Sequence, residues 1–223
     1  MNESLERLLA RAEQLINRIE AVLPQPLGAP GWSQAVAWRY RRRASGQGVL
    51  EPVRHVSGIT LADLKEIEAQ KEKIERNTRQ FVEGRPANNV LLTGARGTGK
   101  SSLIKACLNA YAGDGLRLIE VDKADMTDLP DIVEVVAERP EKFIVYCDDL
   151  SFEEGEPGYK ALKSILDGSV AASTPNVLIY ATSNRRHLLP EYMRDNLSYT
   201  HTDDGEVHPG EVVEEKISLS ERF

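Results

Sequence analysis

The sequence contains only two cysteines, Cys107 and Cys147, among its 223 residues. Two cysteines cannot form the disulfide framework of a small secreted domain, so we expect free thiols in a reducing compartment. The chain also lacks any apolar run approaching the roughly 18 residues that a membrane-spanning helix needs. Residues 1–23 are charged throughout and lack the basic start and apolar stretch of a signal peptide. We therefore expect a cytoplasmic protein with no membrane association.

Charge is unevenly distributed along the chain, whose formal net charge is −7. Residues 1–60 contain eight arginines, five glutamates and no lysine, a balance of +3. The rest of the chain therefore has a balance of −10. This composition is not that of a general nucleic-acid coat, and the asymmetry indicates two segments with different partners.

The N-terminal segment, residues 1–48, has a helical pattern. Apolar residues recur at helical spacing over residues 1–23, which predicts an amphipathic helix. We expect it to pair with another helix, and favour its own neighbour in the chain as the partner. Prolines and glycines over residues 24–31 interrupt the pattern. Residues 32–43 fit a second short helix, with Trp32, Val36 and Tyr40 on one face.

The second segment, residues 49–223, alternates between helices and short apolar strands. Thr60 resembles the N-cap of a long charged helix that ends near residue 82. Helices are then predicted over residues 100–112, 128–138 and 159–166, and strands over 90–92, 116–121, 143–147 and 177–182. This alternation predicts an α/β fold, a parallel sheet covered by helices on both faces. Residues 200–215 are polar and acidic and suggest an exposed loop.

The strongest motif is a phosphate-binding loop between the strand over 90–92 and the helix that follows it. It reads Gly94-Ala95-Arg96-Gly97-Thr98-Gly99-Lys100-Ser101, with Ser102 next. Its glycines allow backbone N–H groups to surround a β-phosphate, Lys100 can reach the β- and γ-phosphates, and the Ser101 hydroxyl can hold Mg²⁺. The helix directs its positive N-terminal end toward the phosphates. We therefore predict a site for a nucleoside triphosphate, ATP, with Mg²⁺.

The strand over 143–147 ends in Asp148 and Asp149, which fits the Walker B pattern of an acid at the carboxyl end of an apolar strand. We predict that Asp148 binds the magnesium ion through water. Asp149 would orient or deprotonate the attacking water. Glu153 and Glu154 are alternatives for that base, since Asp149 has a shorter reach than a glutamate.

A third cluster of polar residues follows the strand over 177–182. A polar side chain at the tip of this strand can contact the γ-phosphate and the attacking water. Asn184 is our candidate for this role, with Ser183 or Thr182 as alternatives.

These motifs, in this order, resemble the core of the AAA+ ATPases. The phrases NNVLLTGARGTGKSSLIKA, CDDLSFEEGE and NVLIYATSNRRHLLPE resemble more closely a family of bacterial AAA+ ATPases of unknown function, which ends in a motif like EKISLSERF. The resemblance covers residues 50–223 well. It implies a three-layer P-loop ATPase core that works as a homo-oligomer, with nucleotide bound between subunits.

The resemblance also implies an arginine finger that reaches into a neighbouring site. Arg222 stands where AAA+ proteins often place this residue, and Arg194 is the alternative. The chain departs from the family in having Asp149 where a glutamate is usual, and we also expect it to lack the small helical lid. Because Asp149 replaces that glutamate, we expect slow hydrolysis or the use of a second acid.

Three functions are compatible with these motifs. We favour an AAA+-type ATPase that hydrolyses MgATP to drive conformational change in an oligomer or a protein partner. A nucleotide-gated binding module with little hydrolysis is the alternative, and a small-molecule P-loop kinase is a third. The stretch Arg39–Arg43, with Trp38 before it, could bind nucleic acid, although such arginines more often make contacts within their own chain. The four histidines show no metal-ligand spacing.

Overall fold

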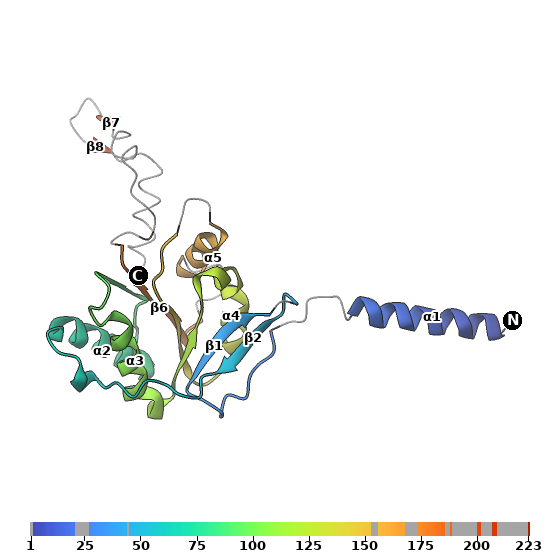
Figure 1. Cartoon of the computed structure of the whole chain (residues 1–223), viewed down its shortest axis with the longest axis horizontal. Coiled ribbons are helices and arrows are strands. Elements are labelled where there is room, and N and C mark those ends of the chain that lie inside the picture. Colours follow the sequence, from blue (N-terminus) through green and yellow to red (C-terminus); the bar gives the residue numbers. More distant parts are fainter. Residues whose placement is uncertain are drawn as a thin grey trace.

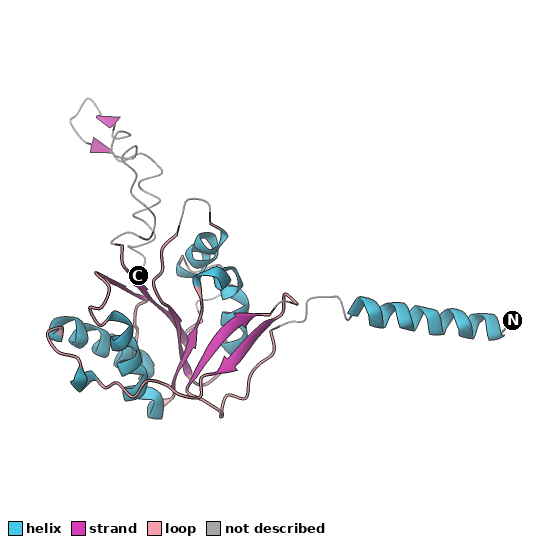
Figure 2. Ribbon diagram, in the orientation of Figure 1, coloured by secondary structure: helices cyan, strands magenta, loops and turns pink. Residues whose placement is uncertain are grey.

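The computed structural model describes residues 2–20, 27–43, 45–152, 156–167, 174–185, 188, 200–201, 207–208 and 223. Figure 1 shows their arrangement and Figure 2 their secondary structure. The α-helices are α1 (Asn2–Glu20), α2 (Glu68–Val82), α3 (Lys100–Tyr111), α4 (Leu129–Val136) and α5 (Pro157–Leu166). The strands are β1 (Ala37–Arg42), β2 (Gly48–Pro52), β3 (Val90–Thr93), β4 (Leu116–Glu120), β5 (Lys142–Cys147), β6 (Val177–Ser183), β7 (Thr200–His201) and β8 (Val207–His208). Three short 3₁₀ helices are η1 (Leu61–Asp63), η2 (Ala112–Asp114) and η3 (Lys123–Asp128).

Six strands form one sheet in the order β2-β1-β4-β5-β6-β3. All neighbours in this sheet are parallel except β1 and β2, which form an antiparallel hairpin at one edge. The parallel strands β3, β5 and β6 therefore present their carboxyl ends at the same edge of the sheet. Strand β6 lies between β3 and β5 and pairs with both.

Helices cover both faces of the sheet, which gives three layers (Figure 1). Helices α2 and α3 pack on one face, and η3, α4 and α5 pack on the other. The central strand β5 contributes to both cores, since Phe143 and Val145 pack on the α4 side while Ile144 and Tyr146 pack on the α3 side. The predicted α/β P-loop core with a parallel sheet is confirmed.

Two expectations from the sequence are wrong. Residues 37–42 form strand β1 and not part of a helix, because Trp38 and Tyr40 alternate with arginines at the two-residue period of a strand. The helix expected to begin after Thr60 is also interrupted: η1 ends at Asp63, and α2 begins only at Glu68. Glu66 has a left-handed backbone (φ 63°), which no α-helix can contain.

The arginines of β1 make ion pairs within the chain. Arg39 pairs with Glu120 on the neighbouring strand β4, at 2.8 Å. Arg42 pairs with Asp128, whose carboxylate also accepts a 2.6 Å hydrogen bond from Tyr40. These pairs favour a structural role for Arg39 and Arg42, and nucleic-acid binding by this stretch stays a prediction.

The two cysteines are free thiols, as the sequence predicts, and both are buried. Cys107 lies on α3 and Cys147 ends β5, and neither side chain is more than 1% exposed. Burial raises the pKa of each thiol to about 12. Both cysteines are therefore unreactive thiols in the folded chain. No described helix has the length and apolar character needed to cross a membrane.

Removing the carboxylate of Asp128 should destabilise the fold. Asp128→Ala leaves the Tyr40 hydroxyl and the Arg42 guanidinium without their acceptor, so we expect the free energy of unfolding to fall by about 2 kcal/mol. Glu51→Ala is the matched control. Glu51 on β2 makes a solvent-exposed ion pair with Arg41 on β1, at 3.9 Å. The control should change stability by no more than about 0.5 kcal/mol. Urea unfolding measures both, and equal losses would contradict this assignment.

Candidate nucleotide site

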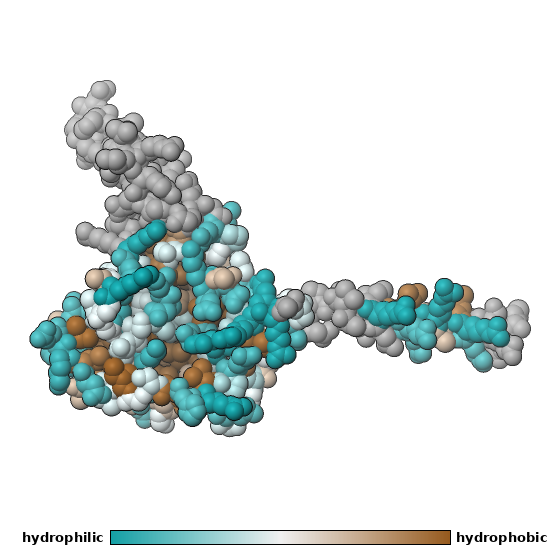
Figure 3. Space-filling view, in the orientation of Figure 1, coloured by the Kyte–Doolittle hydropathy of each residue, from teal (hydrophilic) through white to brown (hydrophobic). Residues whose placement is uncertain are grey.

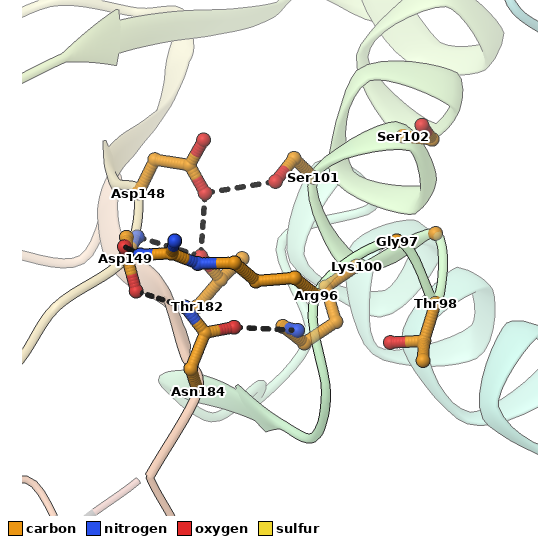
Figure 4. Close-up of a pocket in the computed structure, with 11 residues that line it drawn as sticks. Arg96, Gly97, Thr98, Lys100, Ser101, Ser102, Asp148, Asp149, Thr182 and Asn184 are labelled. Carbon is orange, nitrogen blue, oxygen red and sulfur yellow. Dashed lines mark hydrogen bonds and ion pairs between the residues drawn. The ribbon is translucent and has the colours of Figure 1, made fainter.

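A cavity of about 320 Å³ lies at the carboxyl ends of β3, β5 and β6. Figure 4 shows the side chains that surround it. They come from three chain segments: the loop and first turn after β3, the two residues after β5, and the end of β6. The cavity is lined by Arg96, Gly97, Thr98, Gly99, Lys100, Ser101, Ser102, Asp148, Asp149, Thr182 and Asn184.

The loop between β3 and α3 has the backbone conformation that its glycines permit. Gly97 and Gly99 have φ angles of 80° and 84°, in the left-handed region that residues with a Cβ rarely adopt. Gly99 is also the N-cap of α3, so the loop leads directly into the helix at Lys100. The backbone N–H groups of the first turn of α3 consequently face the cavity, where an anion is stabilised.

Lys100 spans the loop and reaches the end of β6. Its Nζ donates hydrogen bonds to the carbonyl oxygens of Gly94 and Ala95, each at 2.7 Å, and to Asn184 Oδ1 at 3.3 Å. The ammonium group is thus held at the edge of the cavity by three oxygen atoms. An anionic ligand offers the same ammonium stronger, charge-assisted acceptors.

Asp148 is bound by hydroxyl groups from two other segments. Its Oδ1 accepts a 2.8 Å hydrogen bond from Ser101 on α3 and a 2.5 Å hydrogen bond from Thr182 on β6. Figure 4 shows Asp148 directed toward Ser101 across the cavity. The predicted metal residues, Ser101 and Asp148, therefore lie in direct contact although 47 residues separate them in the sequence.

The surroundings of Asp148 favour its ionised form. Partial burial opposes ionisation, but the hydroxyl groups of Thr182, Tyr146 and Ser101 outweigh burial, so the pKa of Asp148 lies below its ordinary value. A carboxylate and a serine hydroxyl are hard oxygen ligands of the kind that Mg²⁺ takes in phosphate sites, where it keeps several waters. The two residues therefore fit a magnesium ion.

Asp149 is held on three sides. Its backbone N–H donates to Thr182 Oγ1 at 2.9 Å, its Oδ1 accepts from Asn184, and its Oδ2 accepts from Arg96 at 3.0 Å. Its backbone is left-handed (φ 51°), which is uncommon for a residue other than glycine. These contacts hold a carboxylate between the phosphate loop and the end of β6.

The structure brings most of the predicted site residues together. Gly94 and Ala95 provide the carbonyl groups that hold Lys100, and the other seven loop residues line the cavity. Asn184, on β6's carboxyl end, contacts both Lys100 and Asp149. Arg222, Arg194, Glu153 and Glu154 lie outside the described residues.

Two residues, Thr182 and Arg96, have roles that were not predicted from the sequence. Thr182 links Asp148 to the backbone of Asp149, whereas the sequence offered it only as an alternative contact to the γ-phosphate. Arg96 pairs with Asp149, whereas the sequence suggested only that it belongs to the loop. Both roles depend on the pairing of β6 with β3 and β5, which the sequence does not show.

Replacing Thr182 should raise the pKa of Asp148. Because the folded pKa is lowered, ionised Asp148 stabilises the fold above its ordinary pKa of about 4, and this stabilisation is lost as the pH falls through the lowered value. Thr182→Val removes a hydroxyl that favours the ionised form, and we expect a loss of about 2 kcal/mol at neutral pH that shrinks in acid.

Urea unfolding from pH 7 to pH 3 measures this difference. Thr182→Ser keeps the hydroxyl and serves as the control, so it should retain most of the wild-type stability at every pH. A Thr182→Val loss that is constant across the range would show that the hydroxyl does not act through Asp148.

Three solved structures resemble this fold. DnaI is 17% identical to this chain, and the match spans 85% of this chain and 89% of the DnaI chain, with a TM-score of 0.48. AMPPCP-bound DnaA from Aquifex aeolicus is 19% identical over 58% of this chain, with a TM-score of 0.43. The Aeropyrum pernix ORC1 protein in complex with DNA is 17% identical over 54%, with a TM-score of 0.44. This chain covers only 43% of the DnaA chain and 39% of the ORC1 chain.

No curated protein matches the chain. One family model does match, and its family is described as "Protein of unknown function (DUF815)". The match covers residues 33–223, from just before β1 to the last residue. The family of unknown function that the motifs predicted is therefore confirmed. The chain belongs to the DUF815 family.

Proposed function

We propose that this protein binds MgATP at the cavity beside the phosphate loop and hydrolyses it, as an ATPase of the AAA+ type. One observation carries the proposal: the Ser101 hydroxyl and the Asp148 carboxylate meet at 2.8 Å beside Lys100, at the N-terminus of α3. A phosphate loop, a metal-binding hydroxyl and an acid from a separate strand are the parts that bind a nucleoside triphosphate. Strand β6, between the strands that carry the loop and Asp148, brings these parts to one edge of the sheet, and the AAA+ type rests on the motifs of the sequence.

Each group has a role in binding. The backbone N–H groups of Gly97–Lys100 surround the β-phosphate, and Lys100 exchanges its carbonyl contacts for β- and γ-phosphate oxygens. Ser101 and Asp148 would hold the magnesium ion, which would supply positive charge beside the phosphate oxygens.

Hydrolysis requires a water molecule in line with the γ-phosphate. A bond forms between the water oxygen and the γ-phosphorus, and the bond from that phosphorus to the β–γ bridging oxygen breaks, which yields ADP and inorganic phosphate. Asp149 orients the water and accepts its proton, while the Asn184 amide helps to position both. Arg222 of a neighbouring subunit is our candidate for stabilising the charge that develops, in a homo-oligomer with nucleotide between subunits.

One observation favours a second function, a nucleotide-gated module that hydrolyses little. Both carboxylate oxygens of Asp149 already have partners, Asn184 and Arg96. The ion pair with Arg96 competes with transfer of a proton to Asp149. If that transfer does not occur, ATP stays bound and the chain acts through its nucleotide-bound conformation.

The first test concerns binding. Lys100→Ala should weaken ATP affinity by about 100-fold, because the phosphate oxygens lose a charge-assisted donor. Lys73→Ala removes the same charge from an exposed position on α2 and should bind ATP like the wild type. Isothermal titration with a non-hydrolysable ATP analogue measures both, and unchanged affinity in Lys100→Ala would refute the assignment of the phosphate loop.

The second test separates binding from turnover. Asparagine tolerates the left-handed backbone at position 149, so Asp149→Asn should keep its fold and its affinity for ATP. We expect turnover to fall by about 100-fold or more, since a general base contributes at least this much. Single-turnover hydrolysis at saturating protein measures this step. Full activity in Asp149→Asn would transfer the role of base to Glu153 or Glu154.

A further inference from the structure

Helix α1 presents an apolar surface that no other described element covers. Leu8, Leu9, Leu15 and Ile16 are each more than half exposed, and they are the large apolar side chains that stand out as exposed among the described residues. At 3.6 residues per turn they fall, with Ala12, within an arc of about 120° along one side of the helix. Figure 3 shows the apolar atoms on the projecting helix, away from the core.

The charged residues of α1 are segregated on either side of this apolar stripe. Arg7, Arg11 and Arg18 border one side, whereas Glu6 and Glu13 border the other. All five side chains are exposed. The helix therefore has a basic flank, an apolar centre and an acidic flank.

We infer that α1 is a self-association helix, which pairs in parallel with α1 of a second copy of this chain. When two such helices face each other in the same direction, the two-fold axis places the acidic flank of each copy against the basic flank of the other. Arg11 of one copy then lies about 3 Å along the axis from the level of Glu13 in the second copy. The apolar stripes pack together between the two rows of opposite charges.

The charge pattern also selects the direction of pairing. In an antiparallel pair the two-fold axis is perpendicular to the helix axes. The acidic flank of one copy, with Glu6 and Glu13, would then face the acidic flank of the other copy. The basic flanks would likewise face each other, and like charges across an interface disfavour that arrangement. Only the parallel pair buries the stripe and places opposite charges together on both sides.

This association does not depend on the nucleotide site. Residues 21–26 separate α1 from the rest of the chain, and the phosphate loop begins at Gly94. We therefore expect full-length protein to dimerise without nucleotide, and the Lys100→Ala variant to dimerise equally well. A failure of ATP binding would therefore leave the inference of self-association intact. Equally, a wild-type chain that stays monomeric would leave the proposed ATP-binding site intact.

The first experiment is sedimentation equilibrium of the full chain over a concentration series without nucleotide. Wild type should approach twice the mass of one chain, and the pair Leu8→Asp with Leu15→Asp should weaken association by about tenfold or more, because it places like charges in the stripe. The matched control is Ala10→Asp with Gln14→Asp, which adds two acidic residues on the opposite face and should leave the dimer intact. Wild type that stays monomeric, or a dimer that survives in the stripe variant, would overturn the inference.

The second experiment tests the direction of pairing by disulfide cross-linking. Leu8→Cys should cross-link to itself in a parallel pair, because equal positions face each other within the short Cβ–Cβ distance of a disulfide. The native cysteines, Cys107 and Cys147, are buried and should not react. Cross-links that form only when Leu8→Cys is mixed with Leu15→Cys would show an antiparallel pair, contrary to the inference.

Discussion

The insertion of β6 between β3 and β5 is the constraint on which the site depends. It places the Thr182 hydroxyl, at the end of β6, where it bonds both the carboxylate of Asp148 and the backbone N–H of Asp149. The same strand continues into Asn184, which reaches Lys100 in the phosphate loop and Asp149 beyond it. A single strand thereby fixes the distance between the loop that would hold phosphates and the acids that would act on them. Among the described strands, β6 is also the one with which β3 pairs, so it joins the phosphate loop to the sheet.

This arrangement has unequal consequences for binding and for chemistry. Ser101 and Asp148 already lie within hydrogen-bond distance of each other, and the hydroxyl groups around Asp148 keep its pKa low, so the carboxylate is ionised at neutral pH. Asp149, in contrast, is restrained by Arg96 and Asn184. These contacts suit the proposed binding of MgATP, whereas the proposed proton transfer to Asp149 competes with its ion pair to Arg96. This difference gives a physical reason for a slow ATPase whose rate depends on a change in the loop or on a neighbouring subunit.

Local patterns in the sequence predicted the phosphate loop, the apolar strands and a magnesium site shared by Ser101 and Asp148, because each depends on spacing within a short segment or on the edge shared by parallel strands. Strand β1 was mistaken for a helix because Trp32, Val36 and Tyr40 also fit a helical period. Its pairing with β2 and β4 and the ion pairs of Arg39 and Arg42 favour the extended form. The roles of Thr182 and Arg96 could not be predicted, since they arise from strand order, a property of residues far apart in the chain. The amphipathic pattern of α1 was readable from the sequence, whereas its exposure, which shows that the core does not cover it, required the structure.

We propose that this chain is an ATPase whose site is completed by assembly. Steady-state phosphate release from MgATP, measured per chain over a protein concentration series, tests this proposal when wild type and Lys100→Ala are compared. We expect a rate per chain that rises with concentration in the wild type and is absent in the variant. Release that is equal in the two proteins would contradict the assignment of the site. ATP binding with no release at any concentration would contradict hydrolysis and leave the nucleotide-gated module as the function.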